Sequence, residues 1–466
     1  MEKIIVQEIE EVTRGHLLQG DPERYITGVS TDSRKASEKD LFVPIVGETH
    51  DAHDFIGSAY DNGCRVFLIS EEDALEKAEA DGRDIEDAAF ILVNDTLQAM
   101  QDLAYHYLQG LNIHKVAVTG SVGKTSTRDM IYYILSEKFK TARPEKNYNN
   151  EIGVPLTIFG LDSTYEAAVF EEGLEYAGDI HRLSRMTRPD ICVITNVGVS
   201  HIENLGTREN IFKAKLEVAD FLPQDGALII NSDSDFLKKE NIDRDCRIIS
   251  CGQDPAYDYS VYNIKDNGTD GILFTLKTKD EECEIDLPVP GAHNAVNAAL
   301  AAAVAKELGI GLDDVKKGLS KLELTGKRLL VKEGRGIKVI DDSYNAAPAS
   351  MKSAIDTLMN TRGKRHAAVL AGMNELGDEW KKYHMEVGRY AADKRVDVLV
   401  GIGDKARSIV EGAESAPATY SVWFPDQESF FEEMDNIILP GDTVIVKGSN
   451  AYKMSVVADR LVGRQE

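Results

Sequence analysis

The segment TGSVGKTS at 119–126 constrains the fold more than any other feature of the sequence. It directly follows the apolar run 116–118 and precedes a stretch with helical periodicity. A buried strand, a glycine-containing loop and a helix in this order are typical of a parallel α/β unit. The glycines let backbone N–H groups approach phosphate oxygens, and the N-terminus of the helix favours an anion. The sequence therefore predicts a nucleotide-phosphate site on a parallel sheet.

Each part of this loop has an expected task. Lys124 adds positive charge, and the hydroxyl of Thr125 or Ser126 is suited to bind Mg²⁺. Val118 stands where the full phosphate-loop pattern has glycine, so the loop is a shortened variant. The residues predicted to bind the nucleotide are Gly120, Ser121, Val122, Gly123, Lys124, Thr125 and Ser126.

Length and charge limit the class of protein. The 466 residues exceed what one hydrophobic core supports, so we expect two to four domains. A formal net charge of -26 repels nucleic acid and anionic membranes, so neither is an expected partner. No apolar run reaches the about 18 residues of a membrane span, and the N-terminal segment is acidic where a signal peptide is basic. These features predict a cytoplasmic protein without membrane insertion.

The five cysteines lack metal-ligand spacing and are odd in number, so we interpret them as inert thiols.

Apolar strands alternate with helices along most of the chain, which predicts an α/β fold with parallel sheets covered on both faces. Changes in pattern divide it into three expected domains, at 1–110, 111–324 and 325–466. A strand-rich stretch between 258 and 290, with a turn at Asn267-Gly268, predicts hairpins. The other expected strand segments are 41–43, 66–69, 116–119, 167–170, 191–195, 227–230, 337–341, 367–372, 396–403 and 442–449.

Polar residues stand where several of these strands end. In parallel sheets, ligands bind outside the carboxyl ends of the strands, so we expect these residues to line a shared rim. They are Glu171, His201, Asp341, Asp342, Gly372 and Lys447. Glu171 and His201 have the ligand types of a metal site, but taken alone they also suit a solvated loop acid and a loop histidine.

A set of motifs in order and at characteristic spacing resembles the Mur ligases, the ATP-dependent amide-forming family of peptidoglycan synthesis. The resemblance runs from about residue 25 to 458. Its carriers are TDSRKASEKDLFVPIVGETHDAHDFI at 31–56, TGSVGKTS at 119–126, NYNNEIGVPLT at 147–157, HIENLGT at 201–207, KAKLEV at 213–218, GAHNAVNAALAAA at 291–303, DDSYNAAPASM at 341–351, AGMNELGD at 371–378 and VKGS at 446–449.

The resemblance implies three domains: an N-terminal α/β domain for a UDP-sugar, a central P-loop ATPase-type parallel sheet, and a C-terminal Rossmann-like domain for the incoming amine. It implies ATP, Mg²⁺ in two sites, and a reaction that joins D-alanyl-D-alanine to a UDP-muramoyl tripeptide through an acyl phosphate. The implied partners are these small molecules alone, and we expect a monomer.

Residue roles carried over from the family are expectations of the same kind. Asn294 and Asn297 face the adenine, although a helix cap is the simpler role for Asn294. Arg328 and Asp342 reach ATP and its metal. Lys447 binds the dipeptide carboxylate, although a surface charge is the alternative. The remaining substrate contacts are Ser33, Arg34, Asn149 and Asn150, and the metal ligands are Thr125, Glu171, His201 and Lys215.

Periodicity singles out Lys215. Wound as a helix, residues 211–222 place it inside the apolar arc, while Lys213 faces outward. Its stem could pack while the ammonium reaches water. Alternatively, burial disfavours the charged form, and the free amine can add CO₂ to become a carbamate. In the family the matching lysine is carbamylated and helps to hold Mg²⁺, so Lys124, His201 and Lys215 are the predicted catalytic residues.

Four residues depart from the family pattern: Ala347 in the NAAP segment, the pair Glu175-Tyr176, and Asn450. They affect the substrates rather than the ATP chemistry. The alternatives are therefore a family paralogue with another amine or acceptor, the related folylpolyglutamate synthetase, which lacks the UDP-type domain, and a non-catalytic nucleotide-binding scaffold.

Overall fold

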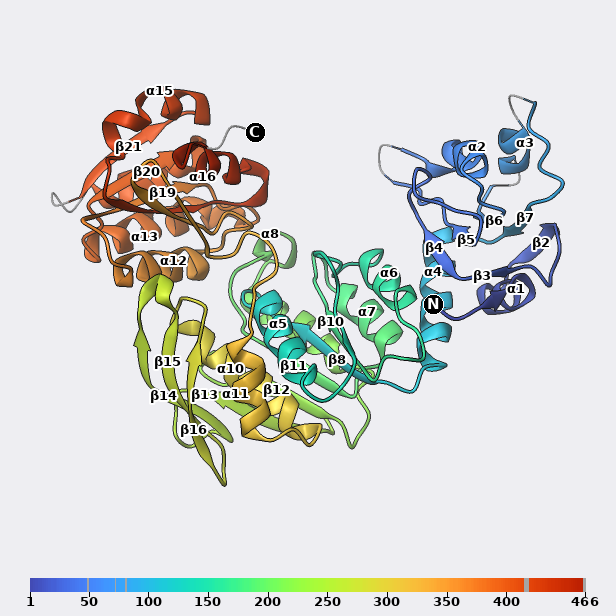
Figure 1. Cartoon of the computed structure of the whole chain (residues 1–466), viewed down its shortest axis with the longest axis horizontal. Coiled ribbons are helices and arrows are strands. Elements are labelled where there is room, and N and C mark those ends of the chain that lie inside the picture. The colour runs from blue at the N-terminus through green and yellow to red at the C-terminus, as the bar shows by residue number, and fades with distance from the viewer. Residues whose placement is uncertain (48–49, 72, 80–81, 415–418, 464–466) are drawn as a thin grey trace. The chain divides into compact units, whose positions relative to one another are not determined.

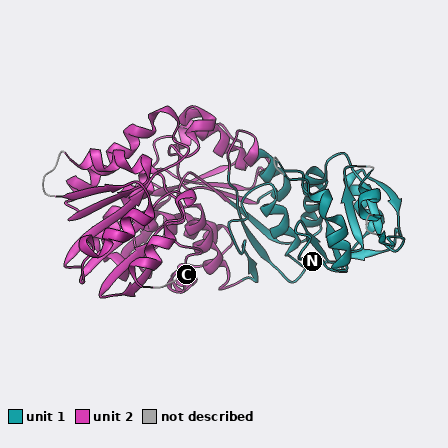
Figure 2. Cartoon of the chain, turned by 90° about the horizontal axis from the view of Figure 1, so that it is seen from above, with its two compact units in different colours: residues 1–117, 139–173, 181–189 teal, residues 118–138, 174–180, 190–466 magenta. Residues whose placement is uncertain are grey.

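The computed structural model describes residues 1–47, 50–71, 73–79, 82–414 and 419–463. The chain packs into two compact units (Figure 2). Unit 1 contains residues 1–117, 139–173 and 181–189, and unit 2 contains residues 118–138, 174–180 and 190–466. These units are defined by packing, and the domain limits near residues 110 and 324 stay a prediction.

A five-stranded sheet forms the N-terminal part of unit 1. Its order is β2-β7-β6-β5-β4, parallel except for the pair β2-β7. The strands are β2 (His16–Gln19), β4 (Gly28–Ser30), β5 (Asp40–Phe42), β6 (Val66–Ile69) and β7 (Ala89–Leu92), and the helices are α1 (Val6–Thr13), α2 (Ile56–Asp61), α3 (Ala74–Glu79) and α4 (Thr96–Gln109). A separate pair consists of β1 (Ile4–Ile5) and β3 (Tyr25–Ile26).

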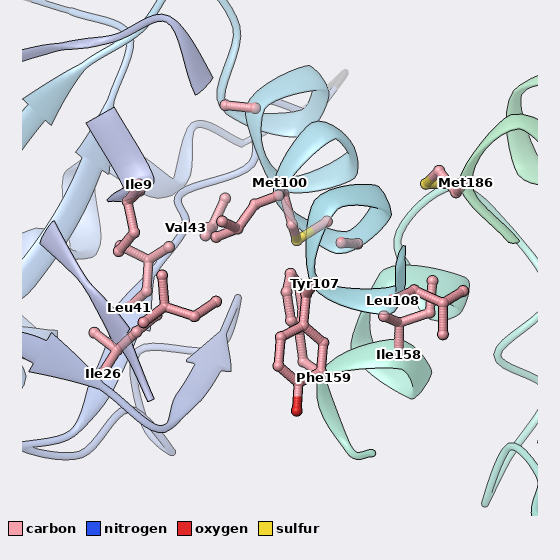
Figure 3. Packing of buried hydrophobic residues seen from close by; sticks show 14 of the residues in the cluster. Ile9, Ile26, Leu41, Val43, Met100, Tyr107, Leu108, Ile158, Phe159 and Met186 are labelled. Carbon is pink, nitrogen blue, oxygen red and sulfur yellow. The ribbon is translucent and has the colours of Figure 1, made fainter. Parts of the chain in front are cut away.

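Alternate residues of these strands enter two different cores. Leu41 belongs to the cluster on the face of α4, whereas Phe42 belongs to the cluster on the other face. The first cluster continues through Met100, Tyr107 and Leu108 of α4 to Ile158 and Phe159 of α6 (Gly153–Phe159) (Figure 3). Burial on both faces explains why these strands are apolar throughout.

The central sheet passes through both units, because β8 (His114–Thr119) begins in unit 1 and ends in unit 2. In unit 1 its order is β8-β10-β9, with β9 (Thr141–Ala142) and β10 (Ala167–Glu171). Helix α7 (Asp179–Thr187) begins in unit 2 and continues in unit 1 from residue 181. In unit 2 the order from the end of β8 is β11-β12-β13-β14-β15-β16.

The unit 2 strands of this sheet are parallel from β11 to β14 and antiparallel from β14 to β16. The hairpins predicted between 258 and 290 are therefore confirmed. The strands are β11 (Ile191–Ile194), β12 (Ala227–Asn231), β13 (Arg247–Gly252), β14 (Tyr259–Asp266), β15 (Ile272–Lys277) and β16 (Glu282–Leu287). The helices are α5 (Lys124–Leu135), α8 (Ile202–Leu205), α9 (Arg208–Leu216), α10 (His293–Glu307) and α11 (Leu312–Ser320) (Figure 1).

The C-terminal part of unit 2 is a six-stranded sheet in the order β17-β18-β22-β19-β20-β21 (Figure 1). Only β17 runs antiparallel. The strands are β17 (Leu330–Gly334), β18 (Ile337–Asp341), β19 (Arg365–Ala371), β20 (Val398–Ile402), β21 (Tyr420–Phe424) and β22 (Asp442–Lys447). The helices are α12 (Pro348–Asn360), α13 (Trp380–Asp393), α14 (Arg407–Ala413), α15 (Gln427–Ile437) and α16 (Ser455–Leu461).

Val369 and Leu370 enter separate clusters on opposite faces of this sheet, which confirms the prediction of a sheet covered on both sides. The edge strands β17 and β21 were not predicted, because their half-exposed residues lack a continuous apolar run. None of the helices in the described part of the chain combines the length and apolar character of a membrane span.

Candidate functional site

The loop between β8 and α5 requires its two glycines. Gly120 has φ 146 and Gly123 has φ 87, a region that favours glycine. A Cβ added to Gly120 would lie 1.9 Å from Thr195 Oγ1. The close approach of the segment after β11 therefore excludes any side chain at this position. The sequence places both glycines, and the segment after β11 explains why Gly120 is needed.

The segment after β11 braces this loop through Asn196. The backbone N–H of Val122 donates to Asn196 Oδ1 (3.0 Å), and Asn196 Nδ2 donates back to Val122 O (3.0 Å). The backbone N–H of Gly198 donates to Ser121 Oγ (2.8 Å). Sequence reasoning did not select Asn196, although a polar residue just after a buried strand was an available signal. These bonds hold the loop in the shape that its glycines permit.

The first turn of α5 carries the residues that we expect to contact phosphate. Lys124 is half-buried, and its Nζ donates to Gly120 O (2.7 Å). Thr125 is buried and Ser126 is half-buried. The loop amides, the helix N-terminus and one lysine thus form an arrangement suited to bind an anion. Its local positive potential offsets the repulsion between an anionic ligand and the negatively charged chain.

Helix α10 packs against α5 and brings Asn297 to the loop. Asn297 Oδ1 lies 3.2 Å from the position of a Cβ on Gly123. Its Nδ2 donates to Asn294 Oδ1 (2.9 Å), and Asn294 Nδ2 donates to Pro290 O (2.7 Å). Asn294 lies inside the helix rather than at its N-cap, so the simpler role of a cap is wrong.

Lys215 lies in the last turn of α9, and only 1% of its surface is exposed, whereas Lys213 is exposed. The alternative in which its ammonium reaches water is therefore wrong. Burial, together with the positive charge of Lys124, lowers the pKa of Lys215 well below its ordinary value. Among the described residues, none is a hydrogen-bond or ion-pair partner of this amine. Burial therefore shifts the equilibrium of Lys215 toward its neutral amine form.

His201 adopts a left-handed conformation (φ 63) just before α8. Its Nδ1 lies 2.6 Å from Glu375 Oε2, a contact between a possible cation and a carboxylate. This contact with His201 holds the pKa of Glu375 below its ordinary value. Glu375 stands in the AGMNELGD segment, yet sequence reasoning gave it no role.

In unit 1, Glu171 is the last residue of β10 and is 2% exposed. Asn149 Nδ2 donates to Glu171 Oε1 (3.0 Å), so the structure brings two predicted residues together. Asn150 instead accepts the backbone N–H of Gly153 (2.8 Å) at the start of α6. The adjacent Glu172 is buried, and burial raises its pKa to about 8.

The TDSR segment of unit 1 forms a turn. Arg34 is exposed and donates to Asp32 through Nε (2.8 Å) and Nη2 (2.9 Å), and this pairing lowers the pKa of Asp32 to about 2. Ser33 is buried, and its carbonyl accepts from Asn62 Nδ2 (2.8 Å). The guanidinium is engaged locally, but its exposure leaves it accessible to an anion.

Unit 1 also contains a group of three side chains with metal-ligand atoms, Asp51, His53 and Glu71. His53 Nε2 accepts the backbone N–H of Ser70 (3.0 Å), and its Nδ1 contacts Asp51 Oδ1 (2.6 Å). Both ring nitrogens are thus used inside the fold, so His53 stabilises this turn rather than offering a ligand.

At the C-terminal sheet, Lys447 and Asp342 lie together. Lys447 is 4% exposed, and its Nζ donates to Asp342 Oδ2 (2.5 Å), to Asn345 O (2.9 Å) and to Asp342 O (3.3 Å). The alternative of a surface charge is therefore wrong. Lys447 connects the end of β22 to the loop after β18.

The linker into the C-terminal sheet is attached to α5. The backbone N–H of Thr325 donates to Asp129 Oδ2 (2.7 Å), and Arg328 Nη1 donates to Thr325 O (2.7 Å). The guanidinium of Arg328 lies 3.9 Å from the ring centroid of Tyr344. Asp129 is fully buried beside Arg128, and sequence reasoning missed it because a charged pair inside a helix looks like a solvated face.

Comparison with family models covers most of the chain. Residues 25–108 match the model described as Mur ligase family, catalytic domain. Residues 118–305 match the Mur ligase middle domain, and residues 327–450 match the Mur ligase, glutamate ligase domain. The middle-domain match contains the phosphate loop, Lys215 and the asparagine pair of α10.

Individual proteins are similar over their full length. UDP-N-acetylmuramoyl-tripeptide--D-alanyl-D-alanine ligase of Bacillus subtilis is 35% identical over 99% of both chains. A crystal structure of MurF from Acinetobacter baumannii covers 100% of both chains with a TM-score of 0.91 and 29% identity. MurF ligase from Thermotoga maritima in complex with ADP has a TM-score of 0.80 and 26% identity, and the match covers 93% of this chain and 96% of that one.

Proposed function

The chain belongs to the Mur ligase family, and we propose that it is the ATP-dependent ligase that joins D-alanyl-D-alanine to UDP-N-acetylmuramoyl-tripeptide in peptidoglycan precursor synthesis. Full-length similarity to ligases of that name supports this substrate pair. The observation that carries the proposal is the braced phosphate loop of unit 2, with Lys124 in the first turn of α5 and Lys215 buried near its charge.

The reaction needs this arrangement because a carboxylate has no adequate leaving group for attack by an amine at neutral pH. Transfer of the γ-phosphoryl group to the tripeptide carboxylate forms an acyl phosphate and releases ADP. The amine of the dipeptide then attacks the acyl carbon, and the amide forms as phosphate leaves. Two anions meet in the first step, so Lys124 and the amides of the loop are positioned to offset their repulsion.

We assign the adenine side of ATP to Asn294 and Asn297, and the third-domain contacts to Arg328 and Asp342. The packing of Asn297 against Gly123 supports the first assignment. The anchored linker at Thr325 supports the second, because it holds Arg328 close to the helix that carries Lys124.

Mg²⁺ fits the donors of unit 2. The Thr125 hydroxyl stands in the first turn of α5, and His201 Nδ1 is a buried nitrogen that no hydrogen bond satisfies. Bound Mg²⁺ would neutralise charge on the phosphoryl oxygens. We further propose that Lys215 adds CO₂ and becomes an anionic carbamate ligand, because its depressed pKa leaves the amine free to react. The role of Glu171 as another ligand rests on the family resemblance.

We assign the uridine diphosphate to Ser33 and Arg34, and the peptide end of the acceptor to Asn149 and Asn150. The exposed guanidinium of Arg34 supports the first assignment. ATP and a UDP-linked sugar are intracellular nucleotides, so we place the reaction in the cytoplasm. The monomeric state, the limits of the three domains and the effect of the four departing residues stay predictions.

The decisive experiment measures ADP release with each substrate omitted in turn. We expect release to require both the UDP-muramoyl tripeptide and D-alanyl-D-alanine. A panel of other amines tests the paralogue alternative: a faster reaction with another amine would replace the dipeptide in the proposal. ADP release that ignores the UDP-linked acceptor would overturn the function itself, and a folded chain that binds ATP without turnover would make it a scaffold.

A further inference from the structure

Two lysines stand at the carboxyl edge of the C-terminal sheet in different surroundings. Lys447 ends β22, and Lys405 lies three residues beyond the end of β20. Parallel strands β22, β19 and β20 are neighbours in the sheet, so both lysines belong to the edge where such folds bind ligands. The dipeptide carries a carboxylate that stays anionic at neutral pH. One of the two cations is suited to receive it.

Lys447 is already neutralised. Its ammonium has three hydrogens, and the structure supplies three acceptors: the Asp342 carboxylate, the Asp342 carbonyl and the Asn345 carbonyl. The residue is almost fully buried. A second carboxylate at this nitrogen would have to displace Asp342. Lys447 is therefore suited to hold Asp342 in place.

Lys405 has the opposite surroundings. It is half-buried, and its Nζ donates to the neutral amide oxygen Asn374 Oδ1 (3.0 Å). No ion pair joins it to a carboxylate of the described residues. A hydrogen bond therefore orients the Lys405 ammonium, and no described carboxylate forms an ion pair with it. This is the state expected of an anion-binding group.

The loops after β19 and β22 pack closely beside Lys405. A Cβ on Gly372, just after β19, would lie 2.9 Å from Lys405 Cβ, so only glycine leaves the lysine stem its place. The backbone N–H of Asn374 donates to Ser449 Oγ (2.9 Å), and the backbone N–H of Ser449 donates to Gly372 O (3.0 Å). The residue that directs Lys405 is therefore itself held by the loops after β19 and β22.

We propose that the two lysines divide the work: Lys405 binds the carboxylate of the incoming dipeptide, and Lys447 is a positioning residue that orients Asp342 toward the nucleotide. This inference rests on the proposed function, because it names where that reaction's amine substrate is recognised. It also replaces the sequence-based expectation that Lys447 contacts the dipeptide.

The test compares D-alanyl-D-alanine with its C-terminal amide, which lacks the negative charge. With the unaltered enzyme, we expect the amide to raise KM by about 10- to 100-fold, the value of a hydrogen bond to a charged group. Lys405→Met should raise KM for the acid by a similar factor and make the acid and the amide equivalent. Its KM for ATP should stay within about twofold. Lys381→Met, at an exposed lysine, is the matched control and should keep the full preference.

Lys447→Met should keep the preference for the acid over the amide while KM for ATP rises and kcat falls. If this variant does not fold, Lys447→Arg answers the same question, because it retains the charge but alters the three contacts. Loss of the acid preference in a Lys447 variant, or its retention in Lys405→Met, overturns the inference. An unaltered enzyme that forms no ADP with the dipeptide refutes the proposed function instead, so the two failures are distinguishable.

Discussion

The last turn of α9 and the end of β22 each bury a lysine, yet the two sites treat the charge in opposite ways. Lys447 is surrounded by one carboxylate and two carbonyls. Lys215 is buried without an ion-pair partner among the described residues, and the charge that acts on it is the cation Lys124. Burial alone is therefore no guide to the state of a lysine. The acceptors within reach decide whether it remains an ammonium or becomes a reactive amine.

The difference assigns the two residues to different tasks. The Lys447 ammonium, whose three N–H groups all have acceptors, fixes the geometry of those acceptors and is not free to react or to bind another group. An unpaired amine gains little from its charge, so it is available for covalent change. Variants at these two positions should therefore affect different measurements.

Replacing Lys215 should have the largest effect on kcat. Lys215→Ala removes the proposed carbamate, and we expect kcat to fall by about 1000-fold, the upper range for one preorganised electrostatic group. A small carboxylate such as formate should restore part of the activity by supplying an anionic oxygen in the space left by the side chain. Turnover measured with and without formate, on protein with an unchanged circular dichroism spectrum, checks this. Full activity of the variant would remove the contrast between the lysines.

Replacing Lys447 should have the largest effect on the free energy of unfolding. Lys447→Met leaves the Asp342 carboxylate in a buried site without its cation, and breaking such a pair costs about 3–5 kcal/mol. Urea unfolding measures this loss. Double substitution of Lys447→Met with Asp342→Asn should recover part of it, because the unpaired charge is then absent. An unchanged unfolding midpoint in the single variant would show that the pair does not stabilise the fold.

The pH dependence of stability should separate the lysines further. The folded chain releases the Lys215 proton at a lowered pKa, whereas the unfolded chain keeps it up to the ordinary value of 10.5. Between these two pKa values the unfolded state binds more protons than the folded state. The contribution of Lys215 to the free energy of unfolding therefore rises with pH. The unfolding free energy of the unaltered protein should therefore rise relative to Lys215→Met, by at most about 1.4 kcal/mol per pH unit. Urea unfolding at pH 7 and pH 9 in CO₂-depleted buffer is the measurement, and a constant difference would contradict the lowered pKa.

The exposed neighbour on α9 should show the smallest effect. Lys213→Ala changes a solvated side chain, so we expect less than about 0.5 kcal/mol in unfolding free energy and unaltered kcat. This variant is the control for Lys215→Ala, since both shorten a lysine of the same helix. A large loss of activity here would mean that the helix, rather than the buried amine, is what matters.

Much of the architecture follows from local pattern. Continuous apolar runs predicted β6, β11, β12 and β20, because strands covered on both faces need apolar residues at every position. Edge strands such as β21 lack that requirement, so their sequences carry no such signal. The place of Lys215 on the apolar side of its helix could also be predicted, because a helix repeats its faces at a known interval. Whether its ammonium reaches water was decided only by the structure, in which the residue is 1% exposed.

The partners of these residues could not be predicted in the same way. Asp129 and Thr325 are separated by 196 positions, and Lys447 and Asp342 by 105. The sequence around one member of such a pair carries no information about the other member, because the contact exists only after the sheets assemble. The same holds for Asn196, which braces a loop 74 positions away.

The sequence by itself determined the chemistry that this protein carries: a phosphate loop, a lysine on the apolar side of a helix, and polar residues at the ends of parallel strands. Only the tertiary structure decided which of those charges are already satisfied. Charge and residue type are local properties of the chain, but the neutralisation of a charge depends on acceptors that distant strands deliver. For this reason Lys447 and Lys405, which look alike in the sequence, differ in the folded protein.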